Sequence, residues 1–145
     1  MNIESELVQF KVKITYDVQW GDMDAANHVN NINYLRWCET ARIAYFAEMN
    51  MDLSFSEGVG PILGWQDCKY IFPLTFPDQA LIACRVESVS EDRFTMECRV
   101  YSIKHDRLCA ISNQVIIPYD YEGLTKAAIP SSWIESINKI EGKTI

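Results

Sequence analysis

The sequence predicts an α+β fold in which one five-stranded sheet curls around a single long helix. Residues 8–20 alternate between apolar and polar side chains, which is typical of a strand with one buried face. Residues 32–49 lack glycine and proline and carry apolar residues on most sides, which predicts a helix buried on several sides. Four further strands follow. A helix of this kind beside one sheet favours a sheet that wraps around it.

The individual elements follow from local patterns along the chain. Asn30 or Asn31 can cap the start of the long helix. Short connections make the last strands antiparallel neighbours. The remaining expected elements are a loop over 50–61, strands over 62–72, 81–89, 94–101 and 108–117, turns over 90–92 and 104–107, and a short helix over 130–137.

The chain has 145 residues, which fits a single domain spanning residues 1–145. Hydrophobic residues make up 48% and charged residues 23%, an ordinary globular balance. The net charge of -7 argues against binding to nucleic acid or to an anionic membrane, because both demand a concentrated basic surface. One local basic spot for a phosphorylated ligand remains compatible with this charge.

The five cysteines are odd in number, form no C-x-x-C pair and lie in apolar segments. We therefore expect buried, reduced thiols. The acidic N-terminus lacks the basic and apolar regions of a signal peptide, and no apolar run approaches the roughly 18 residues of a membrane span. These features predict a cytoplasmic protein that does not enter a membrane.

The segment 21–31 concentrates polar residues between the first strand and the long helix. It holds two carboxylates, Asp22 and Asp24, together with His28 and three asparagines. The start of a helix has unpaired backbone N–H groups, so a carboxylate there can be aimed at a substrate. Asp22 is expected to serve as a turn or capping residue, since aspartate commonly bonds its own backbone two residues further along the chain.

This segment and the helix after it resemble the signature of the 4-hydroxybenzoyl-CoA thioesterase-like, hot-dog-fold acyl-CoA thioesterases. The matching runs are Trp20-Gly21-Asp22-Met23-Asp24, His28-Val29-Asn30-Asn31, Tyr34-Leu35-Arg36 and Glu39-Thr40-Ala41-Arg42. The resemblance implies a helix wrapped in an antiparallel sheet, a homodimer or homotetramer, and thioester hydrolysis at the subunit interface. It covers residues 8–120 in element order, and its specific part is 20–42.

The resemblance also implies roles for individual residues. The family's catalytic carboxylate falls on Asp24, and the backbone amide that polarises the thioester carbonyl falls on Asn31. His28 matches a histidine of plant acyl-carrier-protein thioesterases, but Ala26 stands where those enzymes have an asparagine. Asn27 replaces a glycine of related bacterial sequences and can keep a left-handed backbone conformation.

Thioester hydrolysis needs an activated water or nucleophile and donors for the developing oxyanion. Asp24 can act as general base or attack the carbonyl directly. The Asn31 N–H, at the positive end of the helix, can stabilise the oxyanion. His28 can orient water or Asp24, or bond the substrate. The candidate substrate-binding residues are Asn30, Trp65 and Tyr70; Trp65 and Tyr70 can line an acyl pocket with Phe72, or pack in the core.

Other charged residues have competing interpretations. Glu39 and Arg42 lie three apart and can form a structural ion pair, while Glu39 is also an alternative catalytic carboxylate. His105 is expected to be solvated in a turn. Two distant histidines and dispersed cysteines offer no metal ligand set, so neither metal nor cofactor is expected. Cationic candidates for the coenzyme A phosphates are Lys69, Arg85, Lys104 and Arg107.

The sequence thus predicts an acyl-CoA thioesterase, with an acyl-carrier-protein thioester as the alternative substrate form. Two other functions stay open at this point. One is a hot-dog protein that binds an acyl thioester without turnover. The other is a dehydratase acting on acyl thioesters, for which His28 would be the base.

Overall fold

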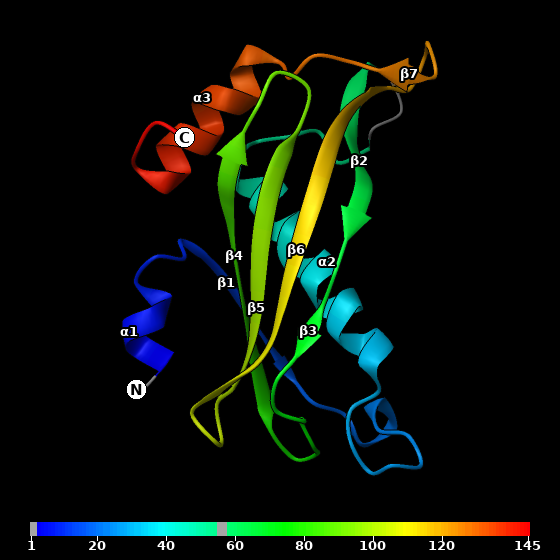
Figure 1. Ribbon diagram of the computed structural model, residues 1–145, viewed down its shortest axis with the longest axis vertical. Helices are drawn as coiled ribbons and strands as arrows, with labels where there is room; N and C mark the ends of the chain where they lie inside the picture. The colour runs from blue at the N-terminus through cyan, green and yellow to red at the C-terminus, as the bar shows by residue number, and fades with distance from the viewer. Residues whose placement is uncertain (1–2, 55–57) are drawn as a thin grey trace.

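The computed structural model describes residues 3–54 and 58–145, and it consists of a curved sheet with one long helix on its concave side (Figure 1). The expected loop over 50–61 therefore lies partly outside the described residues, at 55–57. In chain order the elements are α1 (Ile3–Leu7), β1 (Val12–Asp17), the short 3-10 helix η1 (Trp20–Asp22), α2 (Asn31–Glu48), β2 (Val59–Gln66), β3 (Lys69–Tyr70), β4 (Gln79–Val89), β5 (Phe94–Ser102), β6 (Arg107–Asp120), β7 (Thr125–Lys126) and α3 (Ser131–Glu141).

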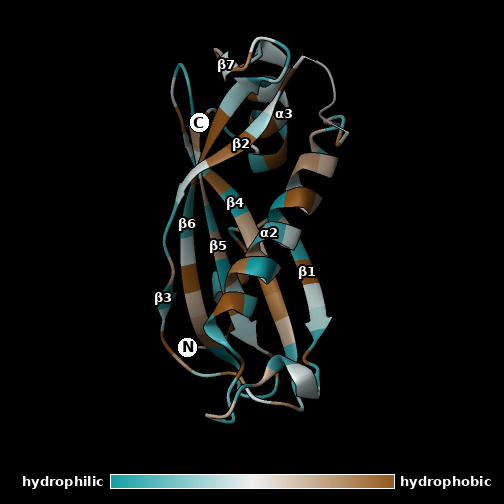
Figure 2. Cartoon of the chain, turned by 90° about the vertical axis from the view of Figure 1, so that its right-hand side faces the viewer, coloured by the Kyte–Doolittle hydropathy of each residue, from teal (hydrophilic) through white to brown (hydrophobic). Residues whose placement is uncertain are grey.

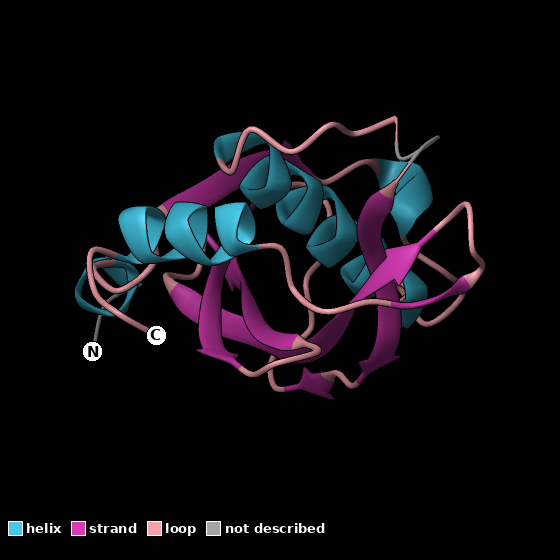
Figure 3. Cartoon of the chain, turned by 90° about the horizontal axis from the view of Figure 1, so that it is seen from above, coloured by secondary structure: helices cyan, strands magenta, loops and turns pink. Residues whose placement is uncertain are grey.

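The five long strands lie in the order β1-β4-β5-β6-β2, and every pair is antiparallel. The short strands β3 and β7 both pair with β6, so the described part of the chain forms a sheet of seven strands where the sequence predicts five. Seen from above, the strands form an arc around α2 (Figure 3). This is the hot-dog fold, and it confirms the predicted wrapping of the helix by an antiparallel sheet.

The helix α2 packs one side against the sheet and leaves the other side open. Its buried residues include Trp37, Tyr45 and Phe46, which join the main core. The prediction of burial nearly all round is wrong for the outward side, where Ile32 is 64% exposed and Ile43 is 38% exposed. The half-barrel closes over one side of the helix only, and Figure 2 shows α2 at its open side.

The long first strand predicted over 8–20 is shorter in the structure. Strand β1 pairs with β4 only from Val12 to Asp17, because β4 begins at Gln79 opposite Asp17. Upstream, the unpredicted helix α1 ends where Phe10 N–H donates to the Leu7 carbonyl. Downstream, Trp20 begins η1 and is 74% exposed. The alternation predicted a strand correctly but could not show how far the partner strand β4 extends along it.

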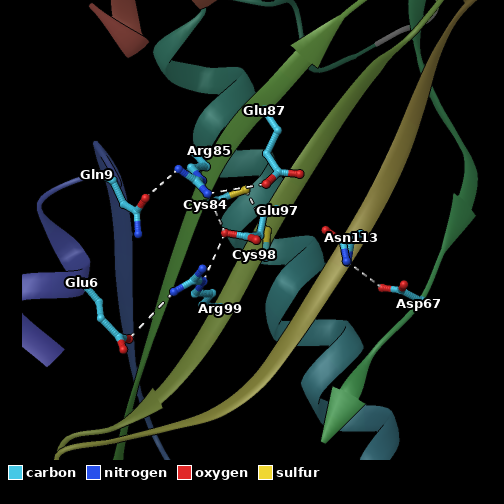
Figure 4. Close-up of polar contacts among 10 residues, drawn as sticks. All are labelled: Glu6, Gln9, Asp67, Cys84, Arg85, Glu87, Glu97, Cys98, Arg99 and Asn113. Atoms are coloured by element: carbon cyan, nitrogen blue, oxygen red, sulfur yellow. Dashed lines mark hydrogen bonds and ion pairs between the residues drawn. The ribbon is translucent and has the colours of Figure 1, made fainter. Parts of the chain in front are cut away.

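The strand predicted over 62–72 is divided into β2 and β3, and β2 begins within the expected loop at Val59. The register of β2 against β6 shifts between Leu63 and Trp65. A Cβ on Gly64 would lie 2.5 Å from Ile117 Cδ1, so glycine allows the close approach at this bulge. Between the two strands, Asp67 accepts hydrogen bonds from the Asn113 backbone N–H at 2.8 Å and from Asn113 Nδ2 at 3.3 Å; Figure 4 shows the side-chain contact.

The C-terminal helix α3 covers one end of the core. It begins after Pro130, as predicted, but continues to Glu141, beyond the expected end at residue 137. Trp133 and Ile137 are buried, and the Trp133 ring lies edge-on against Phe94 at 6.2 Å. Glu141 accepts a hydrogen bond from Tyr45 on α2 at 2.6 Å, which ties the two helices together.

A charged network lies beneath α1 on the outer face of the sheet (Figure 4). Glu97 accepts hydrogen bonds from Arg85 and Arg99, each at 3.1 Å, and both guanidinium groups lie over the Phe10 ring. Glu6 of α1 is 3.8 Å from Arg99. Arg85, a candidate for phosphate binding, is thus engaged by Glu97 on the face away from α2.

All five cysteines are free, and four of them are buried as expected, whereas Cys68 is only partly buried. Cys84 and Cys98 face each other across β4 and β5, with Cys38 of α2 nearby (Figure 4 shows the first two). Burial raises the pKa of the Cys98 thiol well above its ordinary value, so this thiol stays protonated. Among the described residues, no helix is long and apolar enough to cross a membrane.

Candidate active site

The polar segment forms a compact loop between η1 and α2. Asp24 N–H donates to the His28 carbonyl at 3.1 Å, and Asn27 N–H donates to the Asp24 carbonyl at 2.9 Å. Asn27 adopts φ 61°, which confirms the predicted left-handed conformation. An isolated bridge between Met23 and Val29 closes the loop. The position of Asp24 is therefore set by the backbone on both sides of the turn.

Three hydrogen bonds hold this loop against the β3–β4 loop and against the start of α2. Val29 N–H donates to the Leu74 carbonyl at 2.9 Å, and the Asp22 carbonyl accepts from the Asn30 N–H and from Asn33 Nδ2, each at 2.9 Å. Asp22 Oδ2 accepts from the Gln19 N–H at 2.8 Å, which confirms its predicted role in the turn. Asn33 was missed by the sequence analysis; a third asparagine in the first turn of the helix was the available signal.

The Asp24 carboxylate lies beside the start of α2. Its Oδ1 accepts the Ala26 N–H at 2.9 Å, and its Oδ2 accepts Asn30 Nδ2 at 3.0 Å. Asn30 donates to Asp24 through its Nδ2, and its Oδ1 caps the helix by accepting the Ile32 N–H at 2.9 Å. A single asparagine side chain thus links the carboxylate to the first turn. The carboxylate itself is exposed to solvent.

The Asn31 amide lies at the positive end of the 18-residue helix α2. The neighbouring amides all have acceptors: Val29 and Asn30 donate to backbone carbonyls, Ile32 to the Asn30 side chain, and Asn33 to the Asn30 carbonyl. For the Asn31 amide, residues 3–54 and 58–145 supply no acceptor. It is therefore a free, oriented donor next to Asn30, the residue that binds Asp24.

Tyr70 of β3 contacts the same helix start from a distant part of the sequence. Its hydroxyl donates to the Asn31 carbonyl at 2.9 Å, and its ring lies edge-on against Tyr34 at 5.2 Å. The Tyr34 hydroxyl in turn accepts the Leu74 N–H at 3.0 Å. Burial raises the pKa of Tyr70 above its ordinary value, so the hydroxyl stays protonated and keeps its role as donor.

The structure does not bring every candidate to this place. His28 is exposed, and within the described part of the chain its side chain has no hydrogen-bond partner. Trp65 is 55% exposed on β2, and no described contact joins it to Asp24 or Asn31. Glu39 lies 3.8 Å from Arg42, the predicted ion pair; the buried Arg42 also donates to Gln114 at 3.0 Å, a partner that sequence reasoning missed.

A groove of about 550 Å³ runs between α2 and the edge strand β2. It begins at Ile32, one residue after Asn31, and continues past Leu35 toward Arg42. Strand β2 contributes Leu63 and Gln66 to its opposite wall. A thioester whose carbonyl meets the Asn31 amide could extend its acyl group into this groove. No cluster of three or more metal-ligating side chains occurs in the described ranges.

The model of the thioesterase-like superfamily matches residues 18–137. No curated protein matches the chain in sequence at a significant level. Similar solved structures include a thioesterase from Thermus thermophilus determined with coenzyme A and zinc, with 26% identity, a TM-score of 0.84, and coverage of 94% of this chain and 98% of that chain.

A second similar structure is the 1,4-dihydroxy-2-naphthoyl-CoA thioesterase from Synechocystis, with 18% identity, a TM-score of 0.78, and coverage of 87% of this chain and 94% of that chain. A third is the BH1999 gentisyl-coenzyme A thioesterase, with 22% identity, a TM-score of 0.77, and coverage of 86% and 98% respectively. These two likenesses concern the fold. By its family match, the chain belongs to the thioesterase-like superfamily, and thioester hydrolysis is the class of activity that this membership supports.

Proposed function

We propose that the protein is an acyl-CoA thioesterase in which Asp24 activates the attacking group and the Asn31 amide binds the oxyanion. The observation that carries this proposal is the free Asn31 N–H beside a carboxylate that Asn30 holds at 3.0 Å. The sequence resemblance to the 4-hydroxybenzoyl-CoA thioesterase-like family adds support, as do the two coenzyme A thioesterases and the coenzyme A complex of a thioesterase among the similar structures.

In this mechanism the substrate carbonyl oxygen accepts the Asn31 N–H, which stabilises the negative charge that develops there. Asp24 removes a proton from water, whose oxygen attacks the carbonyl carbon; the C–S bond then breaks and the thiolate of coenzyme A leaves and is protonated. In the alternative order of steps, the Asp24 carboxylate attacks the carbonyl carbon itself and the C–S bond breaks with departure of the coenzyme A thiolate. Water then hydrolyses the resulting anhydride, which returns Asp24 and releases the carboxylic acid. The chain's own groups serve both routes.

Tyr70 and Asn30 act in this proposal by positioning the reacting groups. Tyr70 fixes the first residue of α2 through the Asn31 carbonyl, and Asn30 orients the carboxylate. His28, which is exposed at the end of the loop, is available to bond the substrate or a water molecule. The adjoining groove beside Ile32 and Leu63 receives the acyl group.

The test is release of free thiol from a panel of short, long and aromatic acyl-CoAs. We expect turnover of at least one member of the panel, with a carboxylic acid and free coenzyme A as the products. Binding of acyl-CoAs without thiol release would contradict the proposal and favour a binding protein. Loss of water from a 3-hydroxyacyl-CoA, with the thioester intact, would favour a dehydratase.

We further propose that a second copy of the chain pairs with the β2 edge and completes the site. Within residues 3–54 and 58–145, strand β2 pairs only with β6, and its residues Ile62, Leu63 and Trp65 are 40%, 38% and 55% exposed. An exposed apolar edge strand is a template for another strand, and two identical edges pair about a two-fold axis. Ile32 and Ile43, which are also exposed, belong to α2, the helix at the open side of the half-barrel (Figure 2).

This assembly predicts that Ile62→Glu yields monomers and loses most thiol release, because a charge on the exposed β2 edge, outside the acyl groove, opposes burial by the partner. Analytical ultracentrifugation and the thiol assay measure the two effects. Val8→Glu is the matched control, since Val8 is 74% exposed and lies away from β2. An active monomer carrying Ile62→Glu would show that the site is complete within one chain.

A further inference from the structure

The turn between β5 and β6 is held rigidly by a polar anchor. Ser102 donates to Asp78 Oδ2 at 2.5 Å, and Asp78 Oδ1 accepts the Lys104 N–H at 3.0 Å. The His105 N–H donates to Ser102 Oγ at 3.0 Å. Ser102 is fully buried, so the anchor lies inside the protein while the turn lies outside. The backbone of residues 102–105 is therefore fixed before any ligand arrives.

This turn places the Arg107 guanidinium and the His105 ring against one aromatic side chain. The Arg107 guanidinium lies 4.2 Å from the centre of the Phe72 ring, and the His105 ring lies 5.2 Å from it. Phe72 is half-buried and held by its N–H, which donates to the Cys109 carbonyl at 3.1 Å. Lys104, His105 and Arg107 are exposed. We call Phe72, Lys104, His105 and Arg107 the cation–aromatic platform.

The acidic groups nearby are already engaged by hydrogen bonds. Asp78 accepts from the Ser102 hydroxyl and from the Gln79 and Lys104 amides. Asp106, the acid within the turn itself, accepts the Ile3 N–H at 3.2 Å. Within the described residues, the side chains of Lys104 and Arg107 have no hydrogen-bond acceptor, so their donors are left for an anionic ligand.

The platform and the Asp24 loop lie at the same end of the molecule and share one connecting segment. The β3–β4 loop joins both: its Leu74 carbonyl accepts the Val29 N–H, and its Phe76 N–H donates to Met23 Sδ at 3.5 Å. The same loop begins with Phe72 of the platform and ends with Asp78 of the anchor. In both Figure 1 and Figure 2 these loops gather at the lower end.

We infer that the cation–aromatic platform binds the 3′-phosphorylated ADP portion of coenzyme A, an inference that rests on the proposed thioesterase function. Arg107, stacked on Phe72, presents the outer face of its guanidinium plane to a base, a mode of stacking that nucleotide-binding proteins use. Lys104 and Arg107 supply charge-assisted hydrogen bonds to the phosphates. The preferred substrate therefore carries its acyl group on coenzyme A, whose nucleotide the platform binds, and not on an acyl-carrier protein.

The experiment compares one acyl group on two carriers, coenzyme A and N-acetylcysteamine, which lacks the nucleotide. For Arg107→Ala and for Lys104→Ala we expect KM for the acyl-CoA to rise about tenfold with kcat unchanged. Both kinetic constants for the N-acetylcysteamine thioester should equal those of the wild type. Arg93→Ala is the matched control, because Arg93 is also exposed but lies in the β4–β5 turn and pairs with Asp92.

A binding measurement separates this inference from the proposed function. Calorimetric titration with adenosine 3′,5′-bisphosphate should show binding to the wild type and about tenfold weaker binding to Arg107→Ala and Lys104→Ala. An inactive wild type that shows this pattern would overturn the thioesterase and keep the nucleotide site. Unchanged KM values for acyl-CoA in both variants would overturn the nucleotide site. The same acyl group on an acyl-carrier protein is assayed in parallel. If Arg107→Ala and Lys104→Ala lose activity only on that substrate, the platform binds a protein partner and not the nucleotide.

Discussion

Asn31→Pro should lower kcat for acyl-CoA hydrolysis by about 10²–10³-fold while leaving the fold intact. Proline lacks the backbone N–H that Asn31 supplies at the start of α2. This amide has no acceptor within the described residues, so its loss breaks no hydrogen bond of the resting protein. If it binds the oxyanion, its removal acts only when negative charge develops on the carbonyl.

The position is suited to proline. Asn31 is the first residue of the helix, where proline is favoured because its missing N–H would be unsatisfied and its fixed φ fits the helix. The preceding Asn30 has ψ 139°, a value that a residue before proline adopts readily. The Tyr70 hydroxyl can still donate to the carbonyl of residue 31. Circular dichroism and thermal unfolding should therefore match the wild type closely.

Asn31→Ala is the matched control, because it deletes the side chain and keeps the backbone N–H. We expect kcat within a factor of about three of the wild type for this variant. If Asn31→Pro keeps wild-type kcat, the oxyanion donor lies elsewhere. Equal losses in both variants would assign the effect to the side chain of Asn31.

Much of the fold follows from short-range patterns. The alternation in residues 8–20 and the uninterrupted run in 32–49 depend on neighbouring residues, so β1 and α2 were predictable. Their limits were not, because β1 ends opposite the first residue of β4, and the break between β2 and β3 lies where Asp67 accepts the Asn113 N–H across the sheet. Exposure of Ile32 and Ile43 depends on how far the sheet curls, which residue periodicity does not encode.

The candidate site likewise has a part that the sequence predicts and a part that depends on the fold. Asp24, Asn30 and Asn31 lie within eight residues, and their proximity follows from one loop that leads directly into a helix. Tyr70 reaches Asn31 from 39 residues away, and Gln114 reaches Arg42 from 72 residues away. Such contacts depend on strand order and register. The sequence marks Tyr70 as an aromatic residue that can line a pocket, but its hydrogen bond to the Asn31 carbonyl is seen only in the fold.

Asp24→Asn should reduce kcat by about 10³-fold, because the amide can neither accept a proton from water nor attack the carbonyl efficiently. Thiol release under saturating acyl-CoA measures this loss. Substrate binding should persist, since the Asn31 amide and the groove beside Leu63 are unchanged. A non-hydrolysable thioether analogue of the substrate should therefore bind with the wild-type dissociation constant, so that the loss is assigned to the chemical step.

The stability of this variant should fall by only about 1 kcal/mol. The wild-type carboxylate accepts two hydrogen bonds, from Ala26 N–H and Asn30 Nδ2, and an asparagine can replace one oxygen but not both. Asn30 could turn to pair with the new amide, but its Oδ1 would then leave the Ile32 N–H that it caps. Urea denaturation detects either loss, and both are small beside the expected kinetic effect.

Asp22→Asn provides the matched control within the same loop. Its Oδ2 accepts a single bond, from Gln19 N–H, and an amide oxygen can replace that acceptor. We therefore expect near wild-type turnover for Asp22→Asn beside a nearly inactive Asp24→Asn. If Asp24→Asn turns over normally, the carboxylate held by Asn30 is a structural acceptor, and Glu39 or His28 becomes the candidate to activate water. Equal losses in the two variants would indicate that the loop's charge, rather than one positioned carboxylate, supports catalysis.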